Sequence, residues 1–169
     1  MQVKPGIVEG MPEVYATYDV VAYDKDGNIK WEESFRNLVT TAGKTDILQQ
    51  YFKGSGYTAG WFVGLKGTGT AVVGDIMSSH AGWAEVTGYS EAVRQTLTLG
   101  TVSGGSVDNS ASKATFSINA TVTIAGCFVV NNSTKSGTTG TLYSAGDFSA
   151  SRSLASGDSV QITVTLTAA

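Results

Sequence analysis

Alternation of apolar and polar residues is the clearest signal in this chain, and it predicts β-strands. Between Ala114 and Ile124 every second side chain is apolar, and serine, asparagine and threonine stand between them. From Val160 to Leu166 the pattern repeats, with apolar residues at the even positions. Because successive side chains of a strand point to opposite faces, each segment is predicted to have one buried and one solvated face.

Further strands are predicted from short segments rich in β-branched and aromatic residues. They are expected at residues 14–24, 29–35, 61–65, 83–86, 91–99, 127–130, 141–144 and 148–154. In the 91–99 segment, Val93 and Leu97 are expected on one face and Arg94 on the other. Asp26-Gly27 offers the positive φ of a tight hairpin between the first two strands, and Gly157-Asp158 offers a turn before the last.

One short helix is predicted, at about residues 45–53. Four apolar residues recur at the spacing of one buried helical face: Ile47, Leu48, Tyr51 and Phe52. Thr41 or Thr45 suits the N-cap, because a threonine hydroxyl accepts a hydrogen bond from a free backbone N–H. A single helical turn is also expected at residues 75–80.

Short strands at 8–15-residue spacing with one helix predict a mainly β fold, a single-domain antiparallel β-sandwich or jelly roll. The 169 residues suffice for one such domain. Residues 1–13 carry both prolines, Pro5 and Pro12, and are expected to form an extended N-terminal arm. The β-sandwich domain is then expected to span residues 14–169.

Charge is sparse and unevenly distributed. Charged residues make up 15 % of the chain, and the net charge is −3. A net negative charge does not favour binding to the phosphate backbone, so we expect no nucleic-acid binding. Residues 1–94 hold 19 charged side chains and residues 95–169 hold six, so part of the surface is expected to pack on partners. No secretory signal and no long apolar run are present, so we expect no membrane association.

The sequence contains no complete motif for catalysis or metal binding. We therefore expect a non-enzymatic protein without catalytic residues, bound metal or cofactor. His80 is the sole histidine, so a Ser-His catalytic pair has little support. In residues 64–70 the lysine precedes the later glycines, which does not match a phosphate-binding loop, and a flexible loop is expected at these residues. Ser110-x-x-Lys113 lacks its partner motifs, and residues 24–28 do not match a calcium loop. Cys127, the sole cysteine, lies in an apolar run and is expected to be a buried, inert thiol, which fits synthesis in a reducing cytoplasm.

Aromatic residues around the glycine-rich middle of the chain are the candidate interaction surface: Tyr57, Trp61, Trp83 and Tyr89. Exposed aromatics stack on sugars or anchor a protein partner, whereas buried ones belong to the core. A core position fits both tryptophans better, and the tyrosines fit either interpretation. On the arm, the candidate contact residues are Val3, Pro5, Ile7 and Val8.

The order of several short motifs resembles that of small virion proteins of tailed bacteriophages, over about residues 35–168. The motifs are Asn-Leu-Val-Thr-Thr-Ala-Gly at 37–43, Trp-Phe-Val-Gly-Leu at 61–65, Tyr-Ser-Glu-Ala-Val-Arg at 89–94, Ala-Thr-Phe at 114–116, Thr-Ile-Ala-Gly-Cys-Phe-Val at 123–129, Leu-Tyr-Ser at 142–144 and Ser-Gly-Asp-Ser-Val at 156–160. The resemblance implies that Arg94 and Gly126 have structural and not catalytic roles.

The resemblance implies a non-enzymatic capsid decoration, or cement, protein on the phage head surface, assembled in the host bacterial cytoplasm. Such a protein bridges major capsid protein subunits and stabilises the shell by mass action. A homo-oligomer around a local symmetry axis, preferably a trimer, is expected, with the arm adding contacts across subunit boundaries. The alternatives are a phage tail or fibre component and a glycan-binding β-sandwich module.

Overall fold

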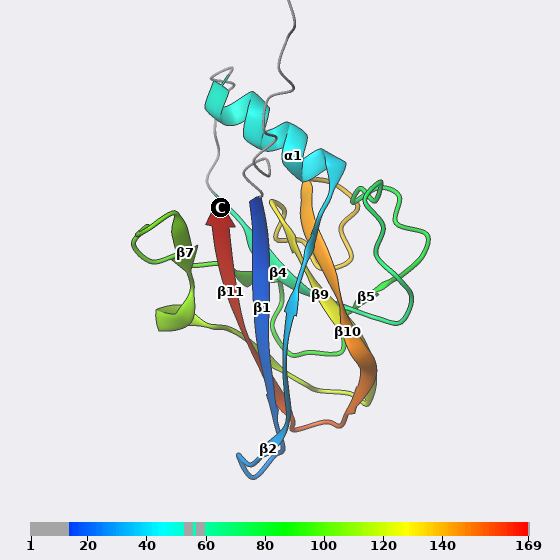
Figure 1. Ribbon diagram of the computed structural model, residues 1–169. Coiled ribbons are helices and arrows are strands. Elements are labelled where there is room, and N and C mark those ends of the chain that lie inside the picture. The colour runs from blue at the N-terminus through cyan, green and yellow to red at the C-terminus, as the bar shows by residue number, and fades with distance from the viewer. Residues whose placement is uncertain (1–13, 53–55, 57–59, 169) are drawn as a thin grey trace, which may run out of the picture.

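Two antiparallel sheets face each other in the computed structural model, which describes residues 14–52, 56 and 60–168 (Figure 1). The first sheet has the order β2 (Ile29–Arg36), β1 (Val14–Tyr23), β11 (Ser159–Ala168) and β7 (Ser106–Asp108), and β8 (Ala114–Ser117) also pairs with β11. The second has the order β3 (Leu38–Val39), β10 (Leu142–Leu154), β9 (Val122–Val130), β4 (Phe62–Lys66) and β5 (Glu85–Val86), and β6 (Gln95–Thr96) also pairs with β4. The predicted mainly β, antiparallel sandwich is confirmed, and the jelly-roll description stays a prediction.

The space between the sheets is filled by the inward side chains of both. In β11 the predicted alternation is confirmed, because Val160, Ile162 and Val164 are buried in the core. The two sheets are also joined by a buried hydrogen bond of 2.8 Å between the Tyr18 hydroxyl and the Ser144 hydroxyl. This bond satisfies both polar groups inside an otherwise apolar core.

A second apolar cluster lies on the outer face of the second sheet, beneath the loop formed by residues 67–84. Met77 and Trp83 of this loop pack against Phe128, Val130 and Leu142. Strand β9 is therefore covered on both faces: Cys127 and Val129 belong to the inner core, while Phe128 and Val130 belong to the outer cluster. Double coverage explains why residues 127–130 are apolar without alternation.

Three strand predictions are corrected by the tertiary structure. The expected strand 114–124 is split, because β8 belongs to the first sheet, β9 to the second, and the chain crosses between them at residues 118–121. The expected strand 91–99 is reduced to β6, and the expected separation of faces is not found, because Arg94 and Leu97 are both buried while Val93 is 45 % exposed. The segments 141–144 and 148–154 are one continuous strand, β10.

The hairpin prediction is confirmed, whereas the expected helical turn at residues 75–80 is wrong. Strands β1 and β2 pair across a turn in which Gly27 has φ +84°, and the Asp24 carboxylate accepts hydrogen bonds from the N–H groups of Asp26 and Asn28. Residues 75–80 form turns with an isolated bridge between Ile76 and Ser79. The carboxylate of Asp75 explains this shape, because it binds the loop's own backbone at Val72.

The helix begins earlier than expected, as α1 (Thr41–Ile47), and continues as the π-helical segment η1 (Leu48–Phe52). Its N-cap is Thr40, whose hydroxyl accepts a hydrogen bond of 3.0 Å from the N–H of Gly43 and donates to the carbonyl of Leu142. The cap thus ties the helix to β10, a contact that local sequence does not reveal. The predicted end near residue 53 and the arm, residues 1–13, lie outside the described residues.

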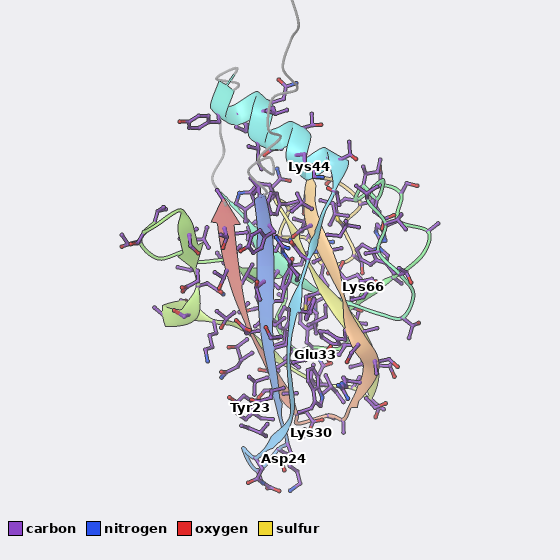
Figure 2. All side chains as sticks on the ribbon, in the orientation of Figure 1. Tyr23, Asp24, Lys30, Glu33, Lys44 and Lys66 are labelled. Carbon is purple, nitrogen blue, oxygen red and sulfur yellow. The ribbon has the colours of Figure 1, made fainter. Side chains whose placement is uncertain are left out.

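Edge strand β2 is joined to β10 by the carboxylate of Glu33 (labelled in Figure 2). It accepts hydrogen bonds from the Ser149 N–H at 2.5 Å and from Arg152 Nη2 at 3.2 Å. The pairing of β9 with β10 is irregular between Asp147 and Arg152, and Ser149 lies within this interval. Burial alone would raise the pKa of the Glu33 carboxyl, but these hydrogen bonds outweigh it and lower the pKa.

Replacing Glu33 by glutamine is expected to make the free energy of unfolding less dependent on pH in the acid range. Because the pKa of Glu33 is lower in the folded chain, its contribution is present at neutral pH and is lost as pH falls through the folded pKa. Urea unfolding of both proteins between pH 7 and 3 measures this, with a stability gap that closes on acidification. Glu32→Gln, an exposed neighbour on the same strand, is the control and is expected to leave the pH profile unchanged. An E33Q profile parallel to that of the unmodified protein would contradict the assignment.

Candidate interaction surface

The helix lies at one end of the sandwich (Figure 1), and exposed apolar side chains occur on it and on the 67–84 loop. Five residues form what we call the helix-end surface, and their side chains are 43–81 % exposed: Leu48, Tyr51, Val72, Val73 and Ile76. The first two belong to η1, and the other three belong to the 67–84 loop. The start of β1 lies at the same end, since Val14 pairs with Ala168.

A groove of about 560 Å³ separates α1 from the 67–84 loop. Thr45 and Gln49 line its helical side, and Gly74 and Ile76 line its loop side. The two sides are joined by a backbone hydrogen bond of 2.9 Å from Thr41 N–H to the Val73 carbonyl. The loop and the helix therefore form one continuous surface.

Two carboxylates fix the conformation of the loop that carries Val72 and Val73. The Asp75 carboxylate accepts hydrogen bonds from the Trp83 indole N–H at 2.8 Å and from the Val72 N–H at 3.0 Å. The Asp147 carboxylate, which comes from β10, accepts a hydrogen bond of 3.1 Å from the Ala71 N–H. Both interactions connect the exposed part of the loop to the buried framework.

Lys66, labelled in Figure 2, ends strand β4 with a fully buried side chain. Its ammonium group lies 2.7 Å from Asp147 Oδ1 and donates hydrogen bonds to the carbonyls of Gly67 and Gly69. A buried charge without such partners would be strongly destabilising, so Lys66 constrains the chain that follows it. Of the loop expected at residues 64–70, residues 64–66 belong instead to strand β4.

An apolar cavity of about 400 Å³ lies on the other side of the helix. Its lining is formed mainly by apolar and aromatic side chains: Ile47, Tyr51, Trp61, Leu97, Val129, Tyr143 and Leu166. The rings of Trp61 and Tyr143 meet edge to face, with centroids 5.6 Å apart. Asp46 and Gln50 supply its polar groups, and Gln50 Nε2 donates a hydrogen bond of 3.3 Å to the Asp46 carboxylate.

The structure separates the predicted aromatic residues. Trp61 is half-buried and lines the cavity, whereas Trp83 and Tyr89 are only 5 % and 1 % exposed. Trp83 packs against Phe128, and Tyr89 meets Phe116 edge to face at 4.9 Å, so neither offers a free ring face to a partner. The interaction prediction is corrected for these two residues.

The remaining predicted contact residues lie outside the part of the chain that the structure describes: Val3, Pro5, Ile7, Val8 and Tyr57. Sequence reasoning in turn missed the helix-end surface. It assigned Leu48 and Tyr51 to a buried helical face, but both are exposed. Val72 and Val73 carried a usable signal, because paired valines are unusual in a glycine- and threonine-rich loop without strand periodicity.

The sole cysteine and the sole histidine of the chain are both packed against other parts of the fold. Cys127 is completely buried, and burial raises the pKa of its thiol. His80 stacks on the Trp83 ring at 4.1 Å and forms a hydrogen bond with the Trp83 carbonyl through Nδ1. Within residues 14–52, 56 and 60–168, no three histidine, cysteine or acidic side chains form a metal-binding group, and no helix has the length and apolarity to cross a membrane.

No protein-family model matches this sequence, and no curated protein shows significant similarity to it.

Proposed function

We propose that this protein is a non-enzymatic virion component of a tailed bacteriophage, a capsid decoration protein that binds the outer head surface and bridges major capsid protein subunits. The observation that carries the proposal is the helix-end surface, a set of five exposed apolar side chains on η1 and on the 67–84 loop, which is hydrogen-bonded to α1. Large exposed apolar side chains in neighbouring elements are frequent at protein-docking sites.

The rigidity of this surface supports a docking role. Asp75 and Asp147 bind the backbone of the loop that carries Val72 and Val73, and Thr41 binds the loop to the helix. A surface ordered before binding loses little conformational entropy on association, which favours affinity.

The N-terminal arm starts from the same end of the domain. Val14, which follows the predicted arm in the sequence, begins β1 beside Ala168 at the end of the sandwich that carries the helix (Figure 1). Fully extended, 13 residues reach roughly 43 Å, which is enough to cross a subunit boundary. Docking through this end would bring both the apolar surface and the arm onto the shell.

Copy number tests the proposal directly. Mass spectrometry of purified virions would compare this chain with the major capsid protein. A ratio near one to one is the expected result for a decoration protein. A few to a few dozen copies would instead place the chain in the tail or a fibre, and absence from the particle would overturn the virion assignment.

Substituting Val73 by aspartate is expected to weaken binding to shells that lack this protein by roughly tenfold or more, because it puts a charge into the apolar contact. Co-sedimentation of purified protein with such shells measures the affinity. Ile29→Asp is the matched control, since Ile29 is 59 % exposed and lies beside the β1–β2 turn, at the opposite end of β1 from Val14. Equal losses for both variants, or none for V73D, would exclude this surface as the docking site.

A further inference from the structure

Lys66 and Asp147 lie on either side of a glycine on the outer face of the second sheet. In the strand register Gly126 of β9 pairs with Lys66 of β4 on one side and with Asp147 of β10 on the other. Residues paired across neighbouring strands point to the same face, so the three positions share the outer face beneath the 67–84 loop. Because Gly126 has no side chain, the space above β9 is open for the long lysine side chain to reach the carboxyl group.

The side-chain nitrogen of Lys66 is held against this carboxyl group. Nζ lies 2.7 Å from Asp147 Oδ1, and the Lys66 side chain is completely buried. The Asp147 side chain is 33 % exposed, but its Oδ1 is buried and accepts no hydrogen bond from the residues that the structure describes. The contact is therefore short without the alignment of a hydrogen bond, an arrangement that leaves the nitrogen free to approach the carboxyl carbon Cγ. Groups held in contact in this way react as if they were at a very high concentration.

Two backbone carbonyls fix the direction of the lysine nitrogen. Nζ donates a hydrogen bond of 3.1 Å to the Gly67 carbonyl and a second hydrogen bond to the Gly69 carbonyl. A neutral amine keeps both of these N–H groups and has one direction left for its lone pair. Asp147 is a third polar contact of the nitrogen, so the lone pair is available to its carboxyl group. A desolvated lysine amine of this kind is a nucleophile.

The two oxygens of Asp147 have different partners, which gives them different roles. Oδ2 accepts a hydrogen bond of 3.1 Å from the Ala71 N–H, whereas Oδ1 faces Lys66. A positioned N–H donor stabilises the negative charge that develops on a carboxyl oxygen when a nucleophile adds to the carbon. Oδ2 is therefore placed to remain as the carbonyl oxygen, and Oδ1 is placed to leave.

We propose that Lys66 and Asp147 condense in the folded chain to form an intramolecular isopeptide bond. One proton passes from Nζ to Oδ1, and the lone pair of the resulting amine forms a bond to Cγ. A second proton passes from Nζ to Oδ1, the Cγ–Oδ1 bond breaks with its electron pair, and Oδ1 leaves as water. One proton stays on the amide nitrogen, so atoms and charge balance without an oxidant, a cofactor or another reactant.

The burial of both groups favours this condensation. An ammonium group and a carboxylate that are kept from water are unfavourable unless they are well paired, and the neutral amide replaces both charges. The bond joins β4 to β10 across β9 and anchors the loop that carries Val72 and Val73. It concerns the folded chain alone, so its presence or absence does not depend on capsid binding.

Mass spectrometry of the purified full-length protein, denatured after overnight incubation in the folded state, tests the proposal. We expect the intact chain to be lighter than its sequence by the mass of one water molecule. Trypsin should then release residues 54–94 joined to residues 136–152, because Lys66 is no longer a cleavage site. An intact mass equal to that of the sequence would overturn the proposal.

The tryptic peptides separate this bond from another reaction that releases water. Cyclisation of Asp26-Gly27 to a succinimide gives the same change in mass, but it leaves Lys66 cleavable and Asp147 unlinked. Separate peptides 54–66, 67–94 and 136–152, without the joined species, would therefore also overturn the proposal.

Two lysine variants provide the matched comparison. Lys66→Arg keeps a cation that can donate to the same carbonyls, but a guanidinium group does not condense with a carboxylate, so the full sequence mass is expected. Lys30→Arg is the control, because Lys30 Nζ lies 2.5 Å from Asp158 Oδ2 but its side chain is 31 % exposed, and the loss of water is expected to remain. Loss of water that persists in K66R, or that disappears in K30R, would contradict the assignment. If K66R does not fold, the joined peptide of the unmodified chain still decides the result.

Discussion

Replacing Arg94 by methionine is expected to lower the free energy of unfolding by about 3–5 kcal/mol, the usual cost of breaking a buried ion pair from one side. The Arg94 side chain is completely buried, and its Nε and Nη2 donate to the two Glu85 oxygens at 2.9 and 2.7 Å. It also donates to the carbonyls of Asn132 and Gly137, both at 2.9 Å. The substitution would leave a buried carboxylate and two carbonyls without these donors, and urea unfolding would measure the loss.

Arg152→Met is the matched control for this prediction. Arg152 is one-third exposed and pairs with Glu33 at 3.2 Å, so its loss is expected to cost no more than about 1 kcal/mol. Adding Glu85→Met to R94M should restore part of the stability, because the uncompensated charge is then removed as well. Similar losses for R94M and R152M, or no recovery in the double variant, would show that the Arg94 ion pair does not stabilise the fold as argued.

Gly43→Ala is expected to destabilise the protein by about 1–3 kcal/mol, although alanine is the better helix former. A Cβ at position 43 would lie 2.3 Å from the Tyr143 carbonyl oxygen and 2.9 Å from its Cα. Backbone atoms of a central strand cannot move away as a flexible side chain can, so α1 must shift from β10. Because Tyr143 also lines the apolar cavity, the shift would alter that cavity together with the adjacent groove.

Thermal unfolding measures the effect of Gly43→Ala. Gly74→Ala is the control, since Gly74 lines the groove but a Cβ at position 74 would meet no atom within 4 Å, and a change within about 0.5 kcal/mol is expected. A G43A protein more stable than the unmodified one would mean that helix propensity outweighs the close packing against Tyr143.

Structural features that depend on residues close together in the sequence could be predicted. The alternation of β11 and the Asp-Gly turn between β1 and β2 both depend on residues close in sequence, and both predictions are confirmed. The burial of Cys127 could also be predicted, because an uninterrupted apolar segment indicates a strand that is covered on both faces.

Arg94 and Lys66 show what sequence could not reveal. Each is a cation that normally lies in water, but each is completely buried because a carboxylate from another strand, Glu85 of β5 for Arg94 and Asp147 of β10 for Lys66, is brought beside it. The N-cap Thr40 was missed for a related reason, because its hydroxyl is positioned by the Leu142 carbonyl of β10, which is far along the chain.

The sequence by itself determined the fold class, the alternation of β11 and the turn between β1 and β2, because a period of two residues and the preferences of Gly and Asp act over a few neighbouring positions. Only the tertiary structure decided where the chain changes sheets at residues 118–121, which charges are buried, and which apolar side chains remain exposed at the helix end. These properties depend on contacts between distant segments, and a local pattern carries no information about which segment will cover it.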